Sequence, residues 1–177
     1  MARAPRRPAL SPALRRRLAV VRLAVFDVDG VLTDGWLYYD ARGGVTKRFD
    51  VQDGHGLAKL LRAGFILVFL SGETAPAVDA RARKLGVQDV RQGVVNKARE
   101  LDDIARRHGV ALDEILYLGD DEVDLASMAR CGVAVAVANA VPAVKAAADY
   151  VTDRPGGHGA AREVADLLLA ARAPAGR

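Results

Sequence analysis

The sequence predicts an α/β fold: a doubly wound parallel sheet with helices on both faces and a β-hairpin inserted after the first strand. Two observations support this prediction. Short apolar runs of strand length alternate with amphipathic stretches of helix length, an order typical of a parallel sheet wrapped by helices. Glycines close several of the helical stretches, as C-caps do. At 177 residues, the chain has the size of one domain.

The chain begins with a basic extension. We predict that residues 1–21 form this extension, that residues 22–171 form the single folded domain, and that residues 172–177 form a tail. Proline and arginine dominate residues 1–10, a composition typical of disorder. Ser11 and Pro12 then supply an N-cap and a first-turn proline for a short helix that reaches about Val20.

The first strand ends in the residues around which the chain is organised. The apolar run Leu23 to Phe26 ends in Asp27 and Asp29, followed by glycine and a Thr-Asp-Gly turn. Because the two carboxylates are two residues apart, they leave the strand towards roughly the same side. Such a pair requires a nearby cation or a proton on one carboxyl group. The plainer alternative is an Asp-rich turn that caps backbone amides.

A β-hairpin is predicted directly after this loop. Two arms, Gly35 to Tyr39 and Val45 to Phe49, flank a Gly-containing turn and are rich in aromatic and β-branched residues. Two strands alone are marginally stable in water. We therefore expect the aromatic side chains to pack on another subunit or on the core of their own chain.

Helices and strands alternate through the rest of the chain. The predicted helices are 53–63, 75–85, 97–108, 122–129, about 141–147 and 160–171, and the predicted strands are 65–70, a short one near 90, 115–118, 133–137 and 150–151. Crossovers between parallel strands are right-handed, so the carboxyl ends of the strands should meet along one edge of the sheet.

Composition excludes several functions. The formal charge is +4, but seven arginines precede the first acidic residue, Asp27, so the remainder carries −3. The basic tail has no aromatic residue for base stacking, and we expect no nucleic-acid binding. The longest apolar run, Phe65 to Leu70, is far below the ~20 residues of a membrane helix, so no membrane association is expected. A single cysteine, Cys131, fits a reducing compartment, and we expect a cytoplasmic protein.

Polar residues gather where the predicted strands end. They are Asp27 and Asp29, then Ser71, Gly72 and Glu73, then Asp120, Asp121 and Asp124, with Lys97 opening a helix. Carboxylate oxygens suit Mg²⁺, which substrate phosphate commonly completes. Ser71 at a helix start and the charge of Lys97 suit a phosphate. No Gly-x-x-x-x-Gly-Lys-Ser/Thr element is present, which excludes that class of nucleotide triphosphatase.

In this order and spacing, these residues resemble the four motifs of the haloacid dehalogenase phosphatase superfamily, whose fold is Rossmann-like. The motifs are Asp27-Val28-Asp29-Gly30 with Thr33-Asp34-Gly35, Ser71-Gly72, Lys97, and Gly119-Asp120-Asp121-x-x-Asp124. The hairpin with Lys47 and Phe49, together with the ending around Gly156-Gly157-His158-Gly159, further resembles the capless 3-deoxy-D-manno-octulosonate 8-phosphate phosphatases and the related nonulosonate 9-phosphate phosphatases. The resemblance covers about residues 22 to 170.

The resemblance implies a role for each motif residue. Asp27 would be the nucleophile and Asp29 the general acid and base. Mg²⁺ would be held by Asp27, Asp120 and the backbone carbonyl of Asp29, with Asp121 binding directly or through water. Ser71 and Lys97 would hold the phosphoryl oxygens. The supporting residues would be Asp124, Gly30 and Thr33, and the substrate-binding residues Lys47, Gly72, Glu73, Lys84 and His158.

The implied function is a Mg²⁺-dependent phosphatase that acts on the phosphate monoester of a 2-keto-3-deoxy sugar acid. The implied assembly is a homotetramer whose subunits help to roof each active site. Two alternatives remain: a non-catalytic tetramerisation module of the kind fused to acylneuraminate cytidylyltransferases, and a low-specificity sugar phosphatase.

Two departures from the family pattern bear on the substrate. Octulosonate phosphatases usually carry arginines at the positions of Glu73 and Gln52. Glu73 with Lys84, eleven residues later, resembles the nonulosonate phosphatases instead. This similarity places a nonulosonate 9-phosphate slightly ahead of the octulosonate 8-phosphate, although a surface ion pair is an equal alternative.

Overall fold

The computed structural model describes residues 10–172, so the predicted disorder up to residue 9 and the tail from residue 173 lie outside the described residues. A six-stranded parallel sheet with the strand order β5-β4-β1-β6-β7-β8 confirms the predicted fold. Its strands are β1 (Leu23–Asp27), β4 (Ile66–Leu70), β5 (Asp89–Arg91), β6 (Ile115–Gly119), β7 (Val133–Ala136) and β8 (Tyr150–Val151).

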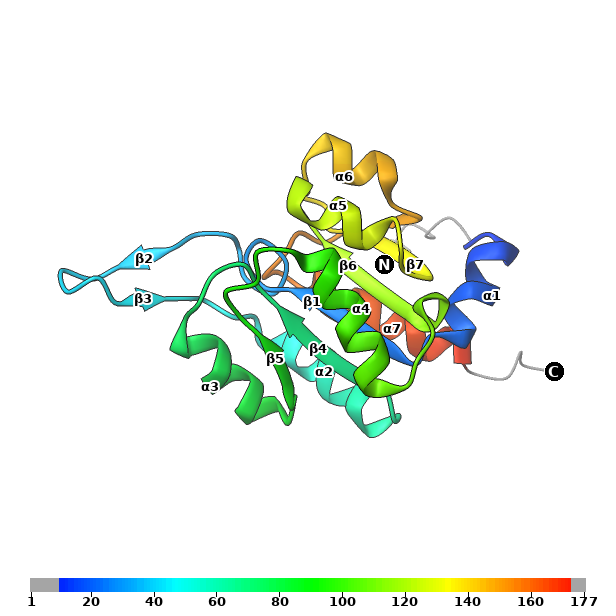
Figure 1. Cartoon of the computed structure of the whole chain (residues 1–177), viewed down its shortest axis with the longest axis horizontal. Coiled ribbons are helices and arrows are strands. Elements are labelled where there is room, and N and C mark those ends of the chain that lie inside the picture. Colours follow the sequence, from blue (N-terminus) through cyan, green and yellow to red (C-terminus); the bar gives the residue numbers. More distant parts are fainter. Residues whose placement is uncertain (1–9, 173–177) are drawn as a thin grey trace, which may run out of the picture.

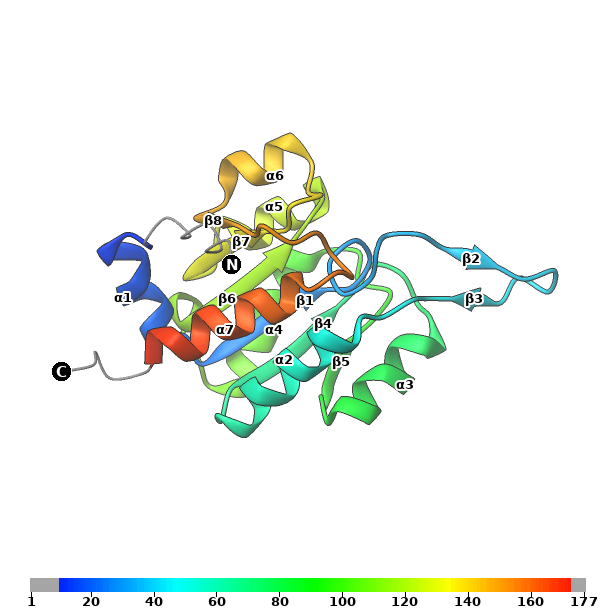
Figure 2. The ribbon, with the colours of Figure 1, turned by 180° about the vertical axis from the view of Figure 1, so that it is seen from behind.

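Helices cover both faces of the sheet. Figures 1 and 2 show α2 (Val51–Arg62) and α7 (Ala160–Arg172) on one face and α4 (Lys97–His108) and α5 (Glu122–Met128) on the other. The remaining helices are α1 (Pro12–Val20), α3 (Pro76–Leu85), α6 (Pro142–Ala147) and a 3₁₀ turn at Leu112–Glu114. None of the helices between residues 10 and 172 combines the length and apolarity needed to cross a bilayer.

Local signals set the helix ends. The Ser11 side chain accepts a hydrogen bond from the Leu14 amide at the start of α1, as predicted. Asp50 caps α2 in the same way, so this helix begins at Val51, two residues before the predicted start. Gly86 ends α3 in the left-handed conformation, with φ 85°, which an L-residue adopts only with strain.

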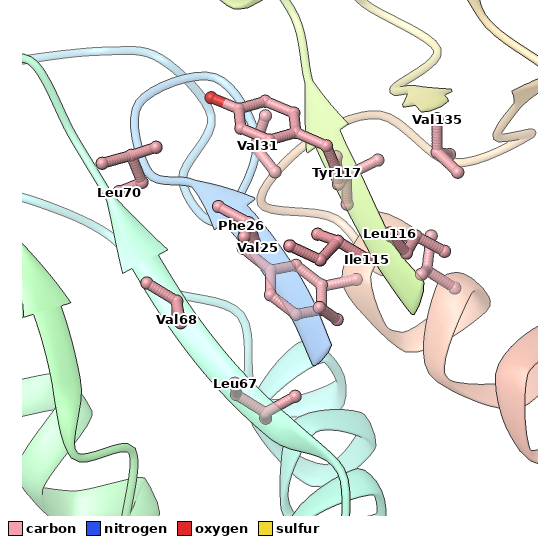
Figure 3. Close-up of a cluster of buried hydrophobic side chains, with 14 of the residues drawn as sticks. Val25, Phe26, Val31, Leu67, Val68, Leu70, Ile115, Leu116, Tyr117 and Val135 are labelled. Carbon is pink, nitrogen blue, oxygen red and sulfur yellow. The ribbon is translucent and has the colours of Figure 1, made fainter. Parts of the chain in front are cut away.

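The sheet is buried through its centre. All five residues of β1 are buried, because helices cover both faces of a parallel sheet. Aliphatic side chains of β1, β4 and β6 interdigitate around Phe26 (Figure 3). From β1 the chain continues through β4 to β5 on one side of the sheet and then crosses to the other side of β1, where β6, β7 and β8 follow. A crevice at the carboxyl ends of β1, β4 and β6 is therefore the expected place for a ligand.

A small hairpin projects from this edge of the sheet (Figure 1). Its strands, β2 (Tyr38–Tyr39) and β3 (Val45–Thr46), are antiparallel and shorter than the predicted arms. Trp36 is 71% exposed and Tyr39 is 67% exposed, so neither packs on the core of its own chain. Phe49 does pack there, with the Arg81 guanidinium 5.7 Å from its ring centroid. Within residues 10–172, the hairpin is the only insertion between β1 and α2.

Candidate active site

The carboxyl ends of β1, β4 and β6 surround a cavity of about 330 Å³. Its walls include Asp27, Asp29, Ser71, Gly72, Glu73, Lys97, Asp120 and Asp121. This volume suits a small ligand. A larger hollow of about 650 Å³ lies beside α4, but its acidic residues Glu100 and Asp103 are paired with arginines. Convergent polar side chains, rather than size, therefore mark the first cavity as the candidate site.

A buried lysine lies at the centre of this site. Lys97 is the first residue of α4, and its Nζ lies 2.8 Å from an oxygen of Asp27 and 2.8 Å from Asp124 Oδ1. All three side chains are at least nine-tenths buried. Their mutual attraction is therefore little screened by water, and the pairing offsets part of the cost of burying the charges.

Three carboxylates approach one another closely enough to share a metal ion. Oxygens of Asp27, Asp120 and Asp124 all lie within 4.8 Å of one another. Asp124 is already saturated, because Oδ1 accepts from Lys97 and Tyr117 and Oδ2 accepts from the backbone amides of Asp120 and Asp121. Asp27 and Asp120 are therefore the carboxylates that remain for a metal.

The charge and the space at this cluster fit Mg²⁺. Three ionised carboxylates with one lysine leave a charge of −2, which one divalent cation would neutralise. Gly30 lies directly against this cluster, since a Cβ atom there would lie 2.0 Å from Asp120 Oδ2. The glycine keeps the Asp120 carboxylate close to the first loop.

Burial and neighbouring charges shift the pKa values of three groups in the cluster. Burial, and then the Asp124 charge, raise the pKa of Asp27 well above its ordinary value, although Lys97 opposes the shift. Burial and Asp124 also raise the pKa of Asp120, to about 6. Burial lowers the pKa of Lys97, but the attraction of Asp27 and Asp124 outweighs this effect and the net shift is upward.

Asp29 is fixed through both of its carboxylate oxygens. Oδ1 accepts from the Lys47 ammonium and Oδ2 accepts from the Ser71 hydroxyl at 3.3 Å. Thr33 holds the loop behind it, because its buried hydroxyl accepts from the amides of Gly30 and Gly35, each at 3.3 Å. Lys47, predicted to bind substrate, thus contacts Asp29 and is absent from the cavity wall.

The structure places the other predicted residues as follows. Gly72, Glu73 and Asp121 line the cavity, and Asp121 also caps α5 through a 2.7 Å bond from the Glu122 amide. Lys84 lies exposed on the last turn of α3, and no ion pair joins it to Glu73 among residues 10–172. His158 lies outside the cavity wall, where its ring meets the Arg48 guanidinium at 2.8 Å.

Sequence reasoning missed four residues at this site. Val94, Val95 and Val123 line the cavity, with Val95 and Val123 exposed. Valine in a loop or at a helix start carries no signal that separates a cavity wall from an ordinary surface. Tyr117 was missed because it lies in an apolar strand and looks like a core residue.

Comparisons with known proteins agree with this geometry. The family model of haloacid dehalogenase-like hydrolases matches residues 70–164. The 3-deoxy-D-manno-octulosonate 8-phosphate phosphatase KdsC of Haemophilus influenzae is 40% identical over 159 residues, which cover 90% of this chain and 88% of the relative.

Two solved structures share the fold. The Moraxella catarrhalis 3-deoxy-D-manno-octulosonate 8-phosphate phosphatase, in complex with magnesium, phosphate and KDO, gives a TM-score of 0.89 at 36% identity and covers 92% of this chain and 93% of that chain. A subfamily III A hydrolase of the same superfamily from Legionella pneumophila gives a TM-score of 0.88 at 39% identity, with coverages of 90% and 88%.

Fold, site and family model together define this protein as a phosphatase of the haloacid dehalogenase type, with no cap domain among its described residues. Such an enzyme hydrolyses phosphoric monoesters. Within this class, the chain belongs to the 3-deoxy-D-manno-octulosonate 8-phosphate phosphatase family, because the similarity to its members extends over nine-tenths of the chain. Magnesium is bound in the Moraxella structure, and the Asp27 and Asp120 carboxylates can hold that ion here.

Stabilisation by Mg²⁺ should depend on pH. The pKa of Asp120 is about 6 in the folded protein and 3.8 without the fold, so folding takes up a proton between these values. The stability that this group contributes is therefore fully present below about pH 4 and is lost as the pH rises through about 6. Mg²⁺ replaces the proton and should raise the melting temperature more at about pH 7.5 than at about pH 5.

Thermal unfolding in EDTA and in Mg²⁺ at the two pH values measures this difference. Asp120→Asn is the control. It removes the carboxylate that takes up the proton and would bind Mg²⁺, so it should abolish most of the rise in melting temperature that Mg²⁺ causes. An equal or larger shift at the lower pH would contradict the assignment of Asp120 as a ligand.

Proposed function

We propose that this protein is a Mg²⁺-dependent phosphatase of a 2-keto-3-deoxy sugar acid, with 3-deoxy-D-manno-octulosonate 8-phosphate as the preferred substrate. The observation that carries the proposal is the arrangement of Lys97 between Asp27 and Asp124, at the floor of a cavity that also holds Asp29 and Ser71. The similarity to octulosonate 8-phosphate phosphatases over 90% of the chain supports the choice of substrate.

The reaction needs two steps. In the first, an Asp27 oxygen attacks phosphorus and the bond from phosphorus to the sugar oxygen breaks, while Asp29 gives that oxygen a proton. In the second, Asp29 takes a proton from a water molecule as the water attacks phosphorus, which frees phosphate and regenerates the Asp27 carboxylate. Lys47 keeps Asp29 in place for both transfers.

Donors in the cavity meet the phosphoryl group. Lys97 and the Ser71 hydroxyl would hold its oxygens, where negative charge is concentrated during transfer. Mg²⁺ would be held by the side chains of Asp27, Asp120 and Asp121 and by the backbone carbonyl of Asp29. When bound, the ion neutralises the charge that builds up between nucleophile and phosphate. Asp124 holds Lys97 and the amides of Asp120 and Asp121 in position.

The second candidate substrate is a nonulosonate 9-phosphate. Glu73 favours it, because this side chain lines the cavity where octulosonate phosphatases usually carry arginine. The absence of an ion pair between Lys84 and Glu73 within residues 10–172 weakens that case. A low-specificity sugar phosphatase is a third possibility that only a substrate panel distinguishes. The convergence of Asp27, Asp29, Lys97 and Asp120 in one cavity argues against a non-catalytic assembly module.

We expect Mg²⁺-dependent phosphate release from octulosonate 8-phosphate to exceed release from ketodeoxynonulosonate 9-phosphate and N-acetylneuraminate 9-phosphate. EDTA should abolish release. Asp27→Asn should lower kcat by more than about a thousandfold, because no other side chain can replace the nucleophile. Steady-state phosphate release from the three compounds measures both effects.

Two further variants identify the specificity residues. Glu73→Arg should lower KM for octulosonate 8-phosphate, since it restores a cation at the cavity. Lys84→Ala should behave like Arg83→Ala, its exposed neighbour on α3, with less than about a twofold change. If the wild type prefers a nonulosonate 9-phosphate and Lys84→Ala alone loses that preference, the octulosonate assignment is overturned. Equal turnover of unrelated sugar phosphates would overturn both candidate substrates, the octulosonate and the nonulosonate.

We also propose that the protein works as a homotetramer whose hairpins bury one another. Trp36, Tyr38 and Tyr39 are more than half exposed on a hairpin that extends beyond the core. Val95 and Val123 are exposed at the cavity, where a neighbouring subunit could cover them. Residues 22–171 would be the catalytic domain, on which α1 packs through Leu14 and Leu18. The cytoplasmic location expected from the single cysteine stays a prediction.

Light scattering after gel filtration tests the assembly. The wild type should have the mass of a tetramer, and the double variant Trp36→Ser, Tyr39→Ser should dissociate because it removes the two most exposed aromatic side chains of the hairpin. Val20→Ser, which alters an exposed apolar residue outside the hairpin, should remain tetrameric. A monomeric wild type, or a double variant that keeps the wild-type mass, would contradict the proposal.

A further inference from the structure

Tyr117 occupies the middle of the sheet, close to the chemistry but without access to the cavity. It lies in β6 between Val25 of β1 and Ala134 of β7, and it is fully buried. Figure 3 shows its ring among aliphatic side chains, with the hydroxyl oxygen at the end turned away from them. A buried tyrosine hydroxyl needs a hydrogen-bond partner, and phenylalanine would fill this apolar space without that need.

The partner of this hydroxyl is part of the catalytic cluster. Tyr117 donates to Asp124 Oδ1 at 2.7 Å, the same oxygen that accepts from Lys97 at 2.8 Å. The second oxygen of Asp124 accepts from the amides of Asp120 and Asp121. Four donors therefore fix one carboxylate, and Tyr117 is the uncharged side chain among them.

Lys97 pairs with two carboxylates. Its Nζ lies 2.8 Å from both Asp124 Oδ1 and an oxygen of Asp27. Without the tyrosine donor, Lys97 would be the only side chain that stabilises Asp124 Oδ1, and the ammonium group would be drawn towards Asp124. Its contact with the nucleophile and with a phosphoryl group in the cavity would weaken accordingly.

We propose that Tyr117 is a positioning residue for phosphoryl transfer. Its hydroxyl donates a hydrogen bond to Asp124, so that Lys97 is not the only side chain that stabilises Asp124 Oδ1 and therefore stays directed at Asp27 and the phosphate. The proposal rests on the phosphatase mechanism given above. Burial and the nearby carboxylates raise the pKa of Tyr117 well above its ordinary value, so the hydroxyl remains a donor under assay conditions.

The test is Tyr117→Phe, which removes one oxygen atom and leaves the ring. We expect kcat to fall about tenfold or more, with KM changed less than about threefold, because the variant loses the hydrogen bond that holds Asp124 beside Lys97. The inhibition constant of orthovanadate, which mimics the phosphoryl group in transfer, should rise by a similar factor. A residue with a purely structural role would lower the melting temperature and leave both values unchanged.

Tyr150→Phe is the matched control. The Tyr150 hydroxyl donates to a carboxylate oxygen of Glu163 at 2.7 Å, the same kind of bond at the same length, between β8 and α7. This variant should lose thermal stability and keep wild-type kcat and vanadate inhibition. Assays at about 10 °C keep both variants folded if Tyr117→Phe melts early.

The outcomes separate this inference from the proposed function. Using p-nitrophenyl phosphate as a generic ester, a Tyr117→Phe protein with kcat and vanadate inhibition within about twofold of the wild type would overturn the positioning role. Equal losses in both tyrosine variants would overturn it as well, because the effect would then be general destabilisation. A wild type that hydrolyses p-nitrophenyl phosphate but no sugar acid phosphate would refute the proposed substrate and leave the Tyr117 comparison valid.

Discussion

The active site depends on one buried lysine that is shared between two buried carboxylates. Lys97 lies 2.8 Å from Asp27 and from Asp124, and the three side chains are almost fully withdrawn from water. Removing Lys97 would leave both buried carboxylates without their shared cation, which is far more costly than the loss of a surface ion pair. Burial, and then the charge of Asp124, raises the pKa values of Asp27 and Asp120. The cluster still carries an excess of negative charge, which a divalent cation would offset.

The fold makes this arrangement possible because it delivers the charged groups from separate strands. β1 brings Asp27, the loop after β6 brings Asp120, α5 brings Asp124, and the start of α4 brings Lys97. The parallel register places these strand ends side by side, while the hydrophobic core beneath them holds the strands rigidly. Gly30 allows the first loop to approach Asp120, and Tyr117 links the core to the cluster from below. Stability and chemistry are therefore coupled at β6.

The sequence was sufficient to predict the parallel sheet, the alternation of strands and helices, and most of the residues that line the cavity. Apolar strands that stop at carboxylates define both the edge of the sheet and the residues that meet there, so the amino-acid pattern alone predicts that Asp27, Asp29, Ser71, Lys97 and Asp120 lie together. The start of α2 was predicted two residues late, because Asp50 caps the helix and Val51 is its first residue. Contacts between distant side chains were beyond the reach of periodicity, as the pairing of Lys47 with Asp29 and of His158 with Arg48 shows. For the same reason, Tyr117 was indistinguishable from a core residue.

We propose that Asp27 attacks phosphorus and carries the phosphoryl group during turnover. Rapid acid quenching of the enzyme during turnover of octulosonate 8-phosphate, followed by borohydride reduction and peptide mass spectrometry, tests it directly, because reduction converts an aspartyl phosphate into homoserine. We expect homoserine at position 27 in the wild type and none without substrate. Homoserine at position 29 or 120, or an unmodified Asp27 in an enzyme that turns over, would contradict it.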